Sequence, residues 1–180
     1  MNSKKMSIRD LSYTSIFTAI IAVCAQVSIP MPYGVPLTLQ TFAIMLAGAV
    51  LGIKNGTITT LLYVALGAVG APVFSLFTGG MGIVLGPTGG FILSFPLLAV
   101  AAGIGARKDS RLWLTLWIAA GTAVNYASGI LMYSIVTSSS LPSSFFIMMQ
   151  FVPTEVLKII VVVASVKVIK QALIKSGALV

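Results

Sequence analysis

Apolar residues occur in long runs along this chain, and only short polar or glycine- and proline-rich segments separate them. A helix that crosses a lipid bilayer needs about 20 consecutive, mostly apolar residues. The pattern predicts about six transmembrane helices, over 11–29, 40–51, 57–69, 89–105, 112–136 and 145–169. The second and third runs are short, so we expect those helices to be short or tilted. The expected fold is an all-α integral membrane protein in which residues 1–180 form a single domain.

The basic residues follow the same division of the chain. With six spans, ten of them share one side of the membrane: Lys4, Lys5, Arg9, Lys54, Arg107, Lys108, Arg111, Lys167, Lys170 and Lys175. The opposite loops, 30–38, 71–86 and 138–144, contain no lysine or arginine. Because loops rich in these residues stay in the cytoplasm, we expect both termini to be cytoplasmic and the protein to lie in the cell membrane.

The composition excludes several classes of protein. The chain is 58% hydrophobic and 8% charged, with a mean hydropathy of +1.08, so the lipid bilayer is its expected solvent. It has no histidine and a single cysteine, Cys24, which excludes the common metal-ligand sets and Ser-His triads, and no cofactor is expected. It has no G-x-x-x-x-G-K-[ST] motif, so we expect neither ATP hydrolysis by this chain nor an enzyme. We attribute the net charge of +8 to membrane orientation rather than to nucleic-acid binding.

The N-terminal segment has a second interpretation. Lys4 and Lys5, followed by the apolar run to Ala25, resemble a signal peptide with a cleavage site near Cys24. The run is long for the apolar core of a signal peptide, and its removal would leave an odd number of spans. We therefore favour an uncleaved first helix.

Glycine and proline are concentrated in two segments on the side without basic residues, 29–41 and 67–90. Neither segment can be regular helix throughout. In lipid, such backbone is tolerated where it is buried in protein or lines a cavity. The second segment is longer than a turn requires and contains Phe74, Phe77 and Met81. We interpret it as an outer loop that folds over a pocket, rather than as a passive connector.

One acid and one base interrupt the last apolar run. Glu155 and Lys158 share one helix face, and Lys158 lies about 14 Å along the helix from Lys167, near the middle of the hydrocarbon core. Ionisable groups at this depth are costly and generally serve a site. We expect Lys158 to reach a ligand carboxylate and Glu155 to accept N–H groups of the ligand or to hold the lysine. The alternative is a neutral pair that only fixes how helices pack.

Other polar side chains are placed to join this site. Thr38 and Gln40 lie at the mouth of the second span, and Asn125 and Tyr126 lie within the fifth. A side-chain amide offers both donors and an acceptor, which suits a ligand with an amide or ureido group. For Asn125, a hydrogen bond between helices is the alternative.

The first span carries small residues at a spacing of four. Ser15 and Ala19 are followed by Val23, with Thr18 and Ala22 beside them. Such strips let another helix approach closely, so we expect this face, with Ser15, Ala19 and Ala22, to dock a partner in the membrane.

Five motifs, in this order, resemble the BioY family, the biotin-specific substrate-binding S components of energy-coupling factor (ECF) transporters. They are PLTLQT at 36–41, GAVGAPVF at 67–74, GG at 79–80, GPTGGF at 86–91 and FVPTEVLK at 151–158. The resemblance covers nearly the whole chain. It implies a six-helix membrane protein that captures biotin on the outer side and works with a transmembrane T component and two ATPase subunits. It also implies a mechanism in which the S component topples and carries its pocket inward, with no reaction on the substrate.

The resemblance also implies particular ligand contacts. The loop 72–90 would close over biotin, with Thr38 and Gln40 near it, and Glu155 and Lys158 would contact the polar ends of biotin. Within the loop, the candidate contacts are Phe74, Gly79, Gly80, Thr88 and Gly89. Two features depart from the family pattern: the family more often has Asp where Glu155 stands, and its A-xxx-A motif in the first helix is here Ser15-xxx-Ala19.

Two other functions are compatible with these residues. A solitary, proton-coupled secondary carrier for a small carboxylate-bearing vitamin would use Glu155 as its proton site. The absence of a convincing inverted repeat argues against such a carrier. A structural membrane subunit without a ligand would use Glu155 and Lys158 for packing alone.

Overall fold

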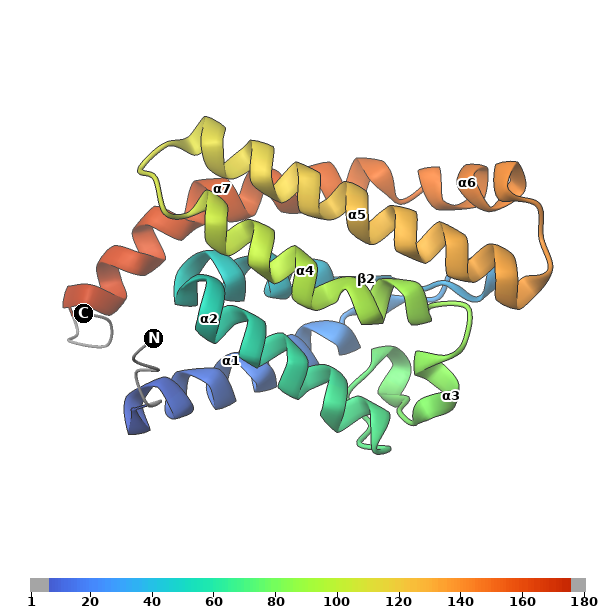
Figure 1. The fold of residues 1–180 in the computed structure, drawn as a ribbon, viewed down its shortest axis with the longest axis horizontal. Coiled ribbons are helices and arrows are strands. Elements are labelled where there is room, and N and C mark those ends of the chain that lie inside the picture. Colours follow the sequence, from blue (N-terminus) through green and yellow to red (C-terminus); the bar gives the residue numbers. More distant parts are fainter. Residues whose placement is uncertain (1–6, 176–180) are drawn as a thin grey trace, which may run out of the picture.

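The computed structural model describes residues 7–175, and helices dominate them (Figure 1). Lys4 and Lys5 of the expected cytoplasmic cluster lie outside the described residues. The α-helices are α1 (Ile8–Gln26), α2 (Gln40–Ala68), α3 (Met81–Val84), α4 (Gly89–Gly105), α5 (Arg111–Thr137), α6 (Leu141–Met149) and α7 (Val152–Lys175). Two short strands, β1 (Ser28–Ile29) and β2 (Leu37–Thr38), pair in antiparallel orientation, and single 3-10 turns form η1 (Pro32–Gly34) and η2 (Ser75–Phe77).

Several of these helices are suited to a membrane. α1, α2 and α5 are each long and apolar enough to cross one, α6 and α7 form a bent pair, at 51°, that would make a fourth span, and α4 is a shorter apolar helix. The outer faces are apolar as well, since Ile135 is 77% and Phe146 is 74% exposed. Large apolar side chains on an outer surface are expected where lipid, not water, surrounds the helix. The mostly helical membrane architecture is confirmed, while six spans and cytoplasmic termini stay predictions.

α2 reverses direction at Gly52, where the backbone adopts φ +79° and ψ 177°. This left-handed φ is favoured at glycine because a Cβ would crowd the backbone. The side-chain amide of Gln40 donates to the hydroxyl of Tyr63, which a straight helix would hold about 35 Å away. A Cβ built on Gly56 would lie 2.7 Å from Cα of Gly48, so the two arms touch near the turn. These arms, 40–51 and 53–68, correspond to the two short runs at 40–51 and 57–69.

α2 and α4 form the centre of the molecule. α4 packs along α2 on one side and α5 on the other, α1 packs against α2, and α7 packs against α2 and α5 (Figure 1). Glycine permits the closest approach: a Cβ on Gly48 would clash with the carbonyl oxygen of Ala99. Ile44, Met45 and Leu98 are fully buried in this core. The two helices therefore provide a closely packed frame for the site.

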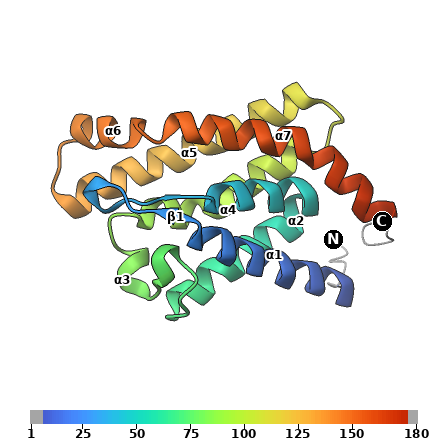
Figure 2. The same cartoon turned by 180° about the vertical axis from the view of Figure 1, so that it is seen from behind.

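The molecule has two different ends, which Figure 2 shows from behind. Both ends of the described chain, the reversal of α2 and the turn between α4 and α5 lie at one end (Figures 1 and 2). The basic segments 52–54, 107–111 and 167–175 belong to this end. The β1–β2 pair, α3 and α6 lie at the other end, together with the glycine- and proline-rich segments.

Candidate functional site

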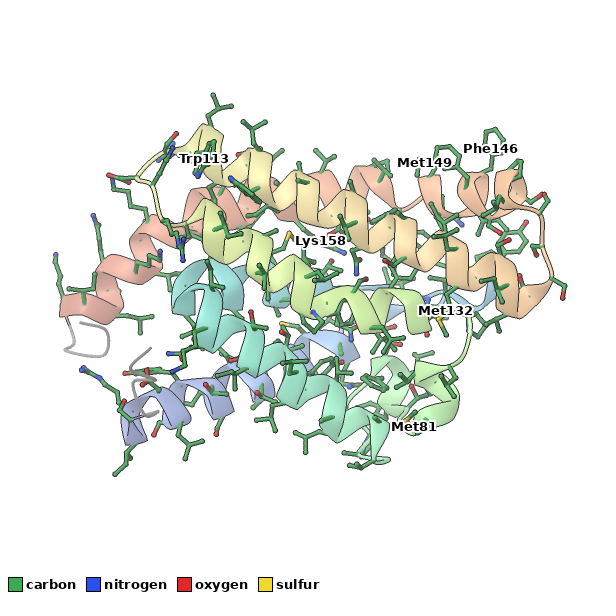
Figure 3. The ribbon with its side chains drawn as sticks, viewed as in Figure 1. Met81, Trp113, Met132, Phe146, Met149 and Lys158 are labelled. Atoms are coloured by element: carbon green, nitrogen blue, oxygen red, sulfur yellow. The ribbon has the colours of Figure 1, made fainter. Side chains whose placement is uncertain are left out.

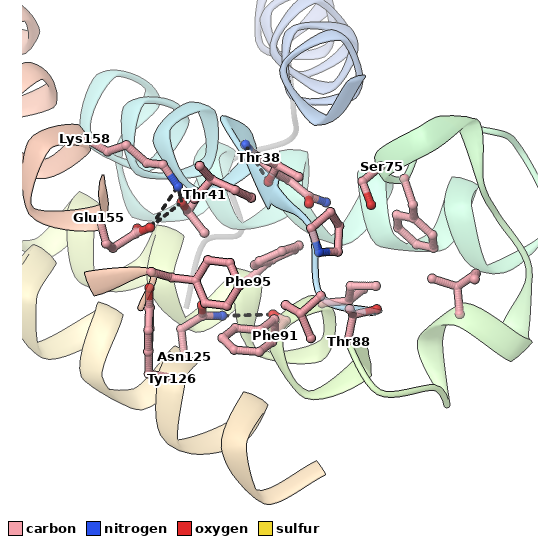
Figure 4. Close-up of a pocket in the computed structure, with 18 residues that line it drawn as sticks. Thr38, Thr41, Ser75, Thr88, Phe91, Phe95, Asn125, Tyr126, Glu155 and Lys158 are labelled. Atoms are coloured by element: carbon pink, nitrogen blue, oxygen red, sulfur yellow. Dashed lines mark hydrogen bonds and ion pairs between the residues drawn. The ribbon is translucent and has the colours of Figure 1, made fainter. Parts of the chain in front are cut away.

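A cavity lies between the first arm of α2, α4, α5, the start of α7 and the two glycine- and proline-rich segments (Figure 4). The volume that the centre of a water molecule can occupy in this cavity is about 80 Å³. This is several times the volume that a single bound water requires. The structure brings most of the predicted site residues together here: Thr38, Gln40, Phe74, Thr88, Asn125, Tyr126, Glu155 and Lys158 all line the cavity. Five separate stretches of the chain thus converge on one concave site.

The acid and the base of α7 form a buried ion pair at the cavity wall. Nζ of Lys158 lies 2.9 Å from Oε2 of Glu155, and their side chains are 10% and 5% exposed. Thr41 completes a triangle (Figure 4): its hydroxyl donates to Oε2 of Glu155 at 3.0 Å and accepts from Lys158 at 3.0 Å. Glu155 lies in the first turn of α7, where the helix dipole favours a negative charge. The pair is therefore held in place by α2 and by its own helix.

Two buried oxygen atoms at this cavity have no hydrogen-bond donor among the described residues. They are Oε1 of Glu155 and Oδ1 of Asn125. The amide nitrogen of Asn125 is used within the protein, since it donates to the carbonyl oxygen of Phe91 at 2.9 Å and to Oγ of Ser94 at 2.7 Å. Because the amide nitrogen is held in this way, Oδ1 of Asn125 remains available as a hydrogen-bond acceptor. Because buried polar atoms in proteins are nearly always paired, the site calls for a guest that supplies donors, or for water.

Aromatic rings form much of the remaining wall. Phe91, Phe95 and Tyr126 line the cavity beside the polar groups (Figure 4), and Phe74 and Phe151 complete the set. The rings of Phe91 and Tyr126 meet edge to face, with centroids 5.6 Å apart. Such walls exclude water and offer flat surfaces to an apolar ring system. The cavity can thus hold a small molecule with one polar, donor-rich part and one apolar part.

The segment 71–80 covers the cavity and is tied down by Gln26 at the end of α1. The amide nitrogen of Gln26 donates to the carbonyl oxygens of Val73 and Phe74, at 3.4 and 3.0 Å, and its oxygen accepts from the N–H of Phe77 at 2.8 Å. In addition, the hydroxyl of Tyr63 in α2 donates to the carbonyl oxygen of Val73 at 2.9 Å. The cover is therefore joined to α1 and α2 through its backbone.

We expect Gln26→Ala to loosen this cover without unfolding the protein. The change removes three hydrogen bonds to 73–77, each of which contributes about 0.5–1.5 kcal/mol. Hydrogen–deuterium exchange of the amides in 71–80 should become faster, while exchange in α4 stays slow. Gln150→Ala is the matched control, because Gln150 is exposed and bonds only its own helix, at the carbonyl oxygen of Ile147. Unchanged exchange in the cover would contradict its attachment through Gln26.

Three predicted ligand contacts, Gly79, Gly80 and Gly89, do not line the cavity. A Cβ on Gly79 would clash with the carbonyl oxygen of Ala71, and one on Gly89 would clash with that of Val84. Gly80 has φ +99°, and its N–H donates to the carbonyl oxygen of Gly67. Gly79 and Gly80 shape the backbone of the cover behind the lining, and Gly89 packs the start of α4 against α3. Their direct contact with a ligand stays a prediction.

The small residues of α1 face mainly outward. Ser15 and Ala19 are exposed, and Ala22 is partly buried against the core. Thr18, by contrast, is buried and donates to the carbonyl oxygens of Thr14 and Thr59. The exposed part of the strip is accessible to another helix, and its docking role stays a prediction.

Sequence reasoning missed several residues of the lining. Thr41 is the most important, because it touches both members of the ion pair. It stands in the PLTLQT motif one position after Gln40, and a threonine at the start of an apolar helix was the available signal. The other missed residues are Val35, Pro36, Leu37, Ser75, Ile83, Phe91, Ile92, Phe95 and Phe151. Among the described residues there is no group of three His, Cys, Asp or Glu side chains that could hold a metal ion.

Comparison with known proteins gives relatives that share most of the chain. A biotin transporter BioY from Rhodobacter capsulatus is 35% identical over 168 residues, which are 85% of this chain and 88% of the relative. A biotin transporter BioY from Thermotoga maritima is 45% identical over 123 residues, 68% of this chain and 72% of the relative. A probable biotin transporter BioY from Pyrococcus horikoshii is 47% identical over 103 residues, and that match spans 57% of this chain and 63% of the relative.

A solved structure has the same fold. It is the crystal structure of the S-component for biotin from an ECF-type ABC transporter, with a TM-score of 0.86 and 26% sequence identity over 95% of this chain and 94% of that chain. These similar proteins are transport proteins, and this chain groups with them rather than with enzymes. The model of the BioY family matches residues 1–175. The chain therefore belongs to the BioY family.

Proposed function

We propose that this chain is the membrane-embedded biotin-binding subunit of an ECF-type transporter. It captures biotin on the outer side of the cell membrane and delivers it inward, in partnership with a T component and two ATPase subunits. The relatives named as biotin transporters and the similar S-component structure support this role. In this proposal six segments cross the membrane: α1, the two arms of α2, α4, α5, and α6 with α7 as one bent span. Both termini are then cytoplasmic, together with the basic end of the molecule.

The observation that carries the proposal is the pair of free acceptors in one aromatic cavity. Biotin has a cyclic urea with two N–H donors, and Oε1 of Glu155 and Oδ1 of Asn125 are the buried acceptors without a donor at this site. Its sulfur-containing ring is apolar and suits the walls formed by Phe91, Phe95 and Phe151. We therefore expect the urea, rather than the carboxylate, to lie beside Glu155. This agrees with the sequence-based expectation that Glu155 accepts N–H groups of the ligand, and it replaces the expectation that Lys158 reaches a carboxylate, because Lys158 is paired with Glu155.

Ligand identity tests this proposal directly. Mass spectrometry of small molecules that co-purify with the detergent-solubilised protein should detect biotin, and titration should show saturable biotin binding. Lipoic acid is a suitable control ligand, because it has a sulfur ring and a carboxylate but no urea. We expect the affinity for lipoic acid to be at least about 100-fold lower than that for biotin, because lipoic acid would leave the two buried acceptors unpaired. Equal binding of the two compounds would contradict the assigned role of Glu155 and Asn125.

Reconstitution separates the subunit from a solitary carrier. The purified chain alone in liposomes, under a proton gradient, should bind biotin without accumulating it. Concentrative uptake should require the T component, both ATPase subunits and ATP. Proton-driven accumulation by the chain alone would replace this proposal with a secondary carrier that uses Glu155 as its proton site.

A further inference from the structure

A second cavity lies at the basic end of the molecule, far along α7 from the biotin site. It opens between the turn that joins α4 to α5 and the last turns of α7. The volume that the centre of a water molecule can occupy in it is about 290 Å³. Figure 3 shows Trp113 at this end, near the start of α5, whereas Lys158 lies toward the middle of the molecule. Nothing in the proposed biotin function uses this cavity.

Positive charge dominates its rim. The cationic side chains that line it are Arg107, Lys108, Arg111, Lys167 and Lys170. The one acid of the lining, Asp109, pairs with Lys167 at 2.9 Å, and both side chains are largely exposed. Among the described residues, the other four cations have no carboxylate partner within ion-pair distance. The rim therefore has an excess of positive charge that no carboxylate of residues 7–175 neutralises.

One of these cations is held in a fixed position. Lys170 is partly buried, and its Nζ donates to the carbonyl oxygen of Ala106 at 3.2 Å. This contact fixes the ammonium group in the lining that it shares with Arg111, which begins α5. The N-terminus of α5 adds a partial positive charge at the same place. A phosphate group is complementary to this arrangement in charge and in its capacity to accept several donors.

The floor of the cavity is apolar. Leu114 and Val166 are buried there, and Val163 lies one turn nearer the middle of α7. Beside the cavity, the rings of Trp113 and Trp117 meet edge to face, and Nζ of Lys108 lies 4.0 Å from the centre of the Trp113 ring. Tryptophan and lysine in this arrangement are typical of the boundary between lipid headgroups and hydrocarbon. The cavity thus combines a cationic rim with an apolar floor, beside residue types that favour the headgroup region.

We propose that this basic cavity binds the phosphate of an anionic phospholipid, such as phosphatidylglycerol or cardiolipin, in the inner leaflet. The phosphate lies between Arg111 and Lys170, and the glycerol and the start of the acyl chains lie on Leu114, Val163 and Val166. A soluble phosphate would also bind the cationic rim, but it has no apolar part to contact the floor. The apolar floor therefore favours the lipid as the source of the phosphate.

Lipid retention in native mass spectrometry tests the proposal. The protein is placed in nanodiscs of equal parts phosphatidylglycerol, cardiolipin and phosphatidylcholine, transferred to detergent, and analysed for retained lipid. We expect anionic lipid to be retained and phosphatidylcholine to be lost. The double variant Arg111→Gln/Lys170→Gln should lower retention of anionic lipid about 30-fold, which corresponds to about 1 kcal/mol for each cation removed. Lys170→Gln alone should show part of this loss.

The controls separate this site from general charge and from folding. Lys175→Gln removes the same charge from an exposed lysine of α7 outside the lining and should leave retention unchanged. Biotin binding by every variant reports that the protein is folded. Glycerol 1-phosphate at millimolar concentration should not displace the lipid, and displacement would identify a site for soluble phosphate instead. Equal retention of phosphatidylcholine, or equal losses in Lys175→Gln and the double variant, would overturn the proposal. Loss of T-component assembly with an unchanged lipid profile would also overturn it, in favour of a protein contact.

Discussion

Lys158→Met is expected to abolish biotin binding and to destabilise the protein at the same time. Lys158 and Glu155 are both buried, so loss of the ammonium group leaves a carboxylate at the cavity wall with only the hydroxyl of Thr41 as a partner. Breaking a buried ion pair from one side costs about 3–5 kcal/mol. The midpoint of thermal unfolding in detergent should fall markedly, and biotin titration should show no saturable binding.

A double variant separates the two effects. Glu155→Met together with Lys158→Met removes both charges, so it should recover most of the lost stability, because no unpaired charge remains buried. It should not recover biotin binding, because the free carboxylate acceptor is gone as well. Lys167→Met is the control: it breaks an ion pair whose side chains are 56% and 83% exposed, where the expected cost is at most about 1 kcal/mol. Full binding by the double variant would show that the buried pair serves only to fix helix packing.

Gly48→Ala is expected to destabilise the packing of α2 against α4 strongly. The new Cβ would clash with the carbonyl oxygen of Ala99, a backbone atom that cannot move unless α4 moves away from α2. Overpacking of this kind costs about 1–3 kcal/mol, and more where backbone rather than a side chain must shift. Because both helices also line the cavity, biotin affinity should fall together with the unfolding midpoint.

Gly82→Ala provides the matched control for this prediction. A Cβ on Gly82 meets no atom within 4 Å, so the same chemical change at that position should leave stability and binding nearly unchanged. If Gly48→Ala and Gly82→Ala unfold at the same temperature, α2 and α4 do not pack as closely as the structure indicates.

The parts of the fold that could be predicted from the sequence are those set by the bilayer. Apolar runs must form helices there, because their backbone groups have no other partners. The two short runs around Gly52 were therefore recognised as separate helices. The buried positions of Glu155 and Lys158 were also predictable, because an apolar helix with two charges at i, i+3 must turn them away from lipid.

The remaining parts of the site depend on contacts between distant residues. Thr41 joins the ion pair across more than a hundred positions of sequence, and Gln26 reaches 47–51 positions to the cover. A threonine or glutamine near a helix end is common, so neither residue type identifies its partner in advance. Gly79 and Gly89 show a second limit of the sequence. Their motifs predict a ligand contact, which stays a prediction, but do not reveal their close packing against the backbone of Ala71 and Val84.

The reversal of α2 at Gly52 has a consequence for the surrounding membrane. Its arms, 40–51 and 53–68, rise only about 18 and 24 Å, whereas the hydrocarbon core is about 30 Å thick. In the proposed topology the bilayer must thin on that flank, and each ångström of mismatch costs a fraction of a kcal/mol. The short hairpin thereby makes the thickness of the surrounding bilayer a part of the energetics of this fold.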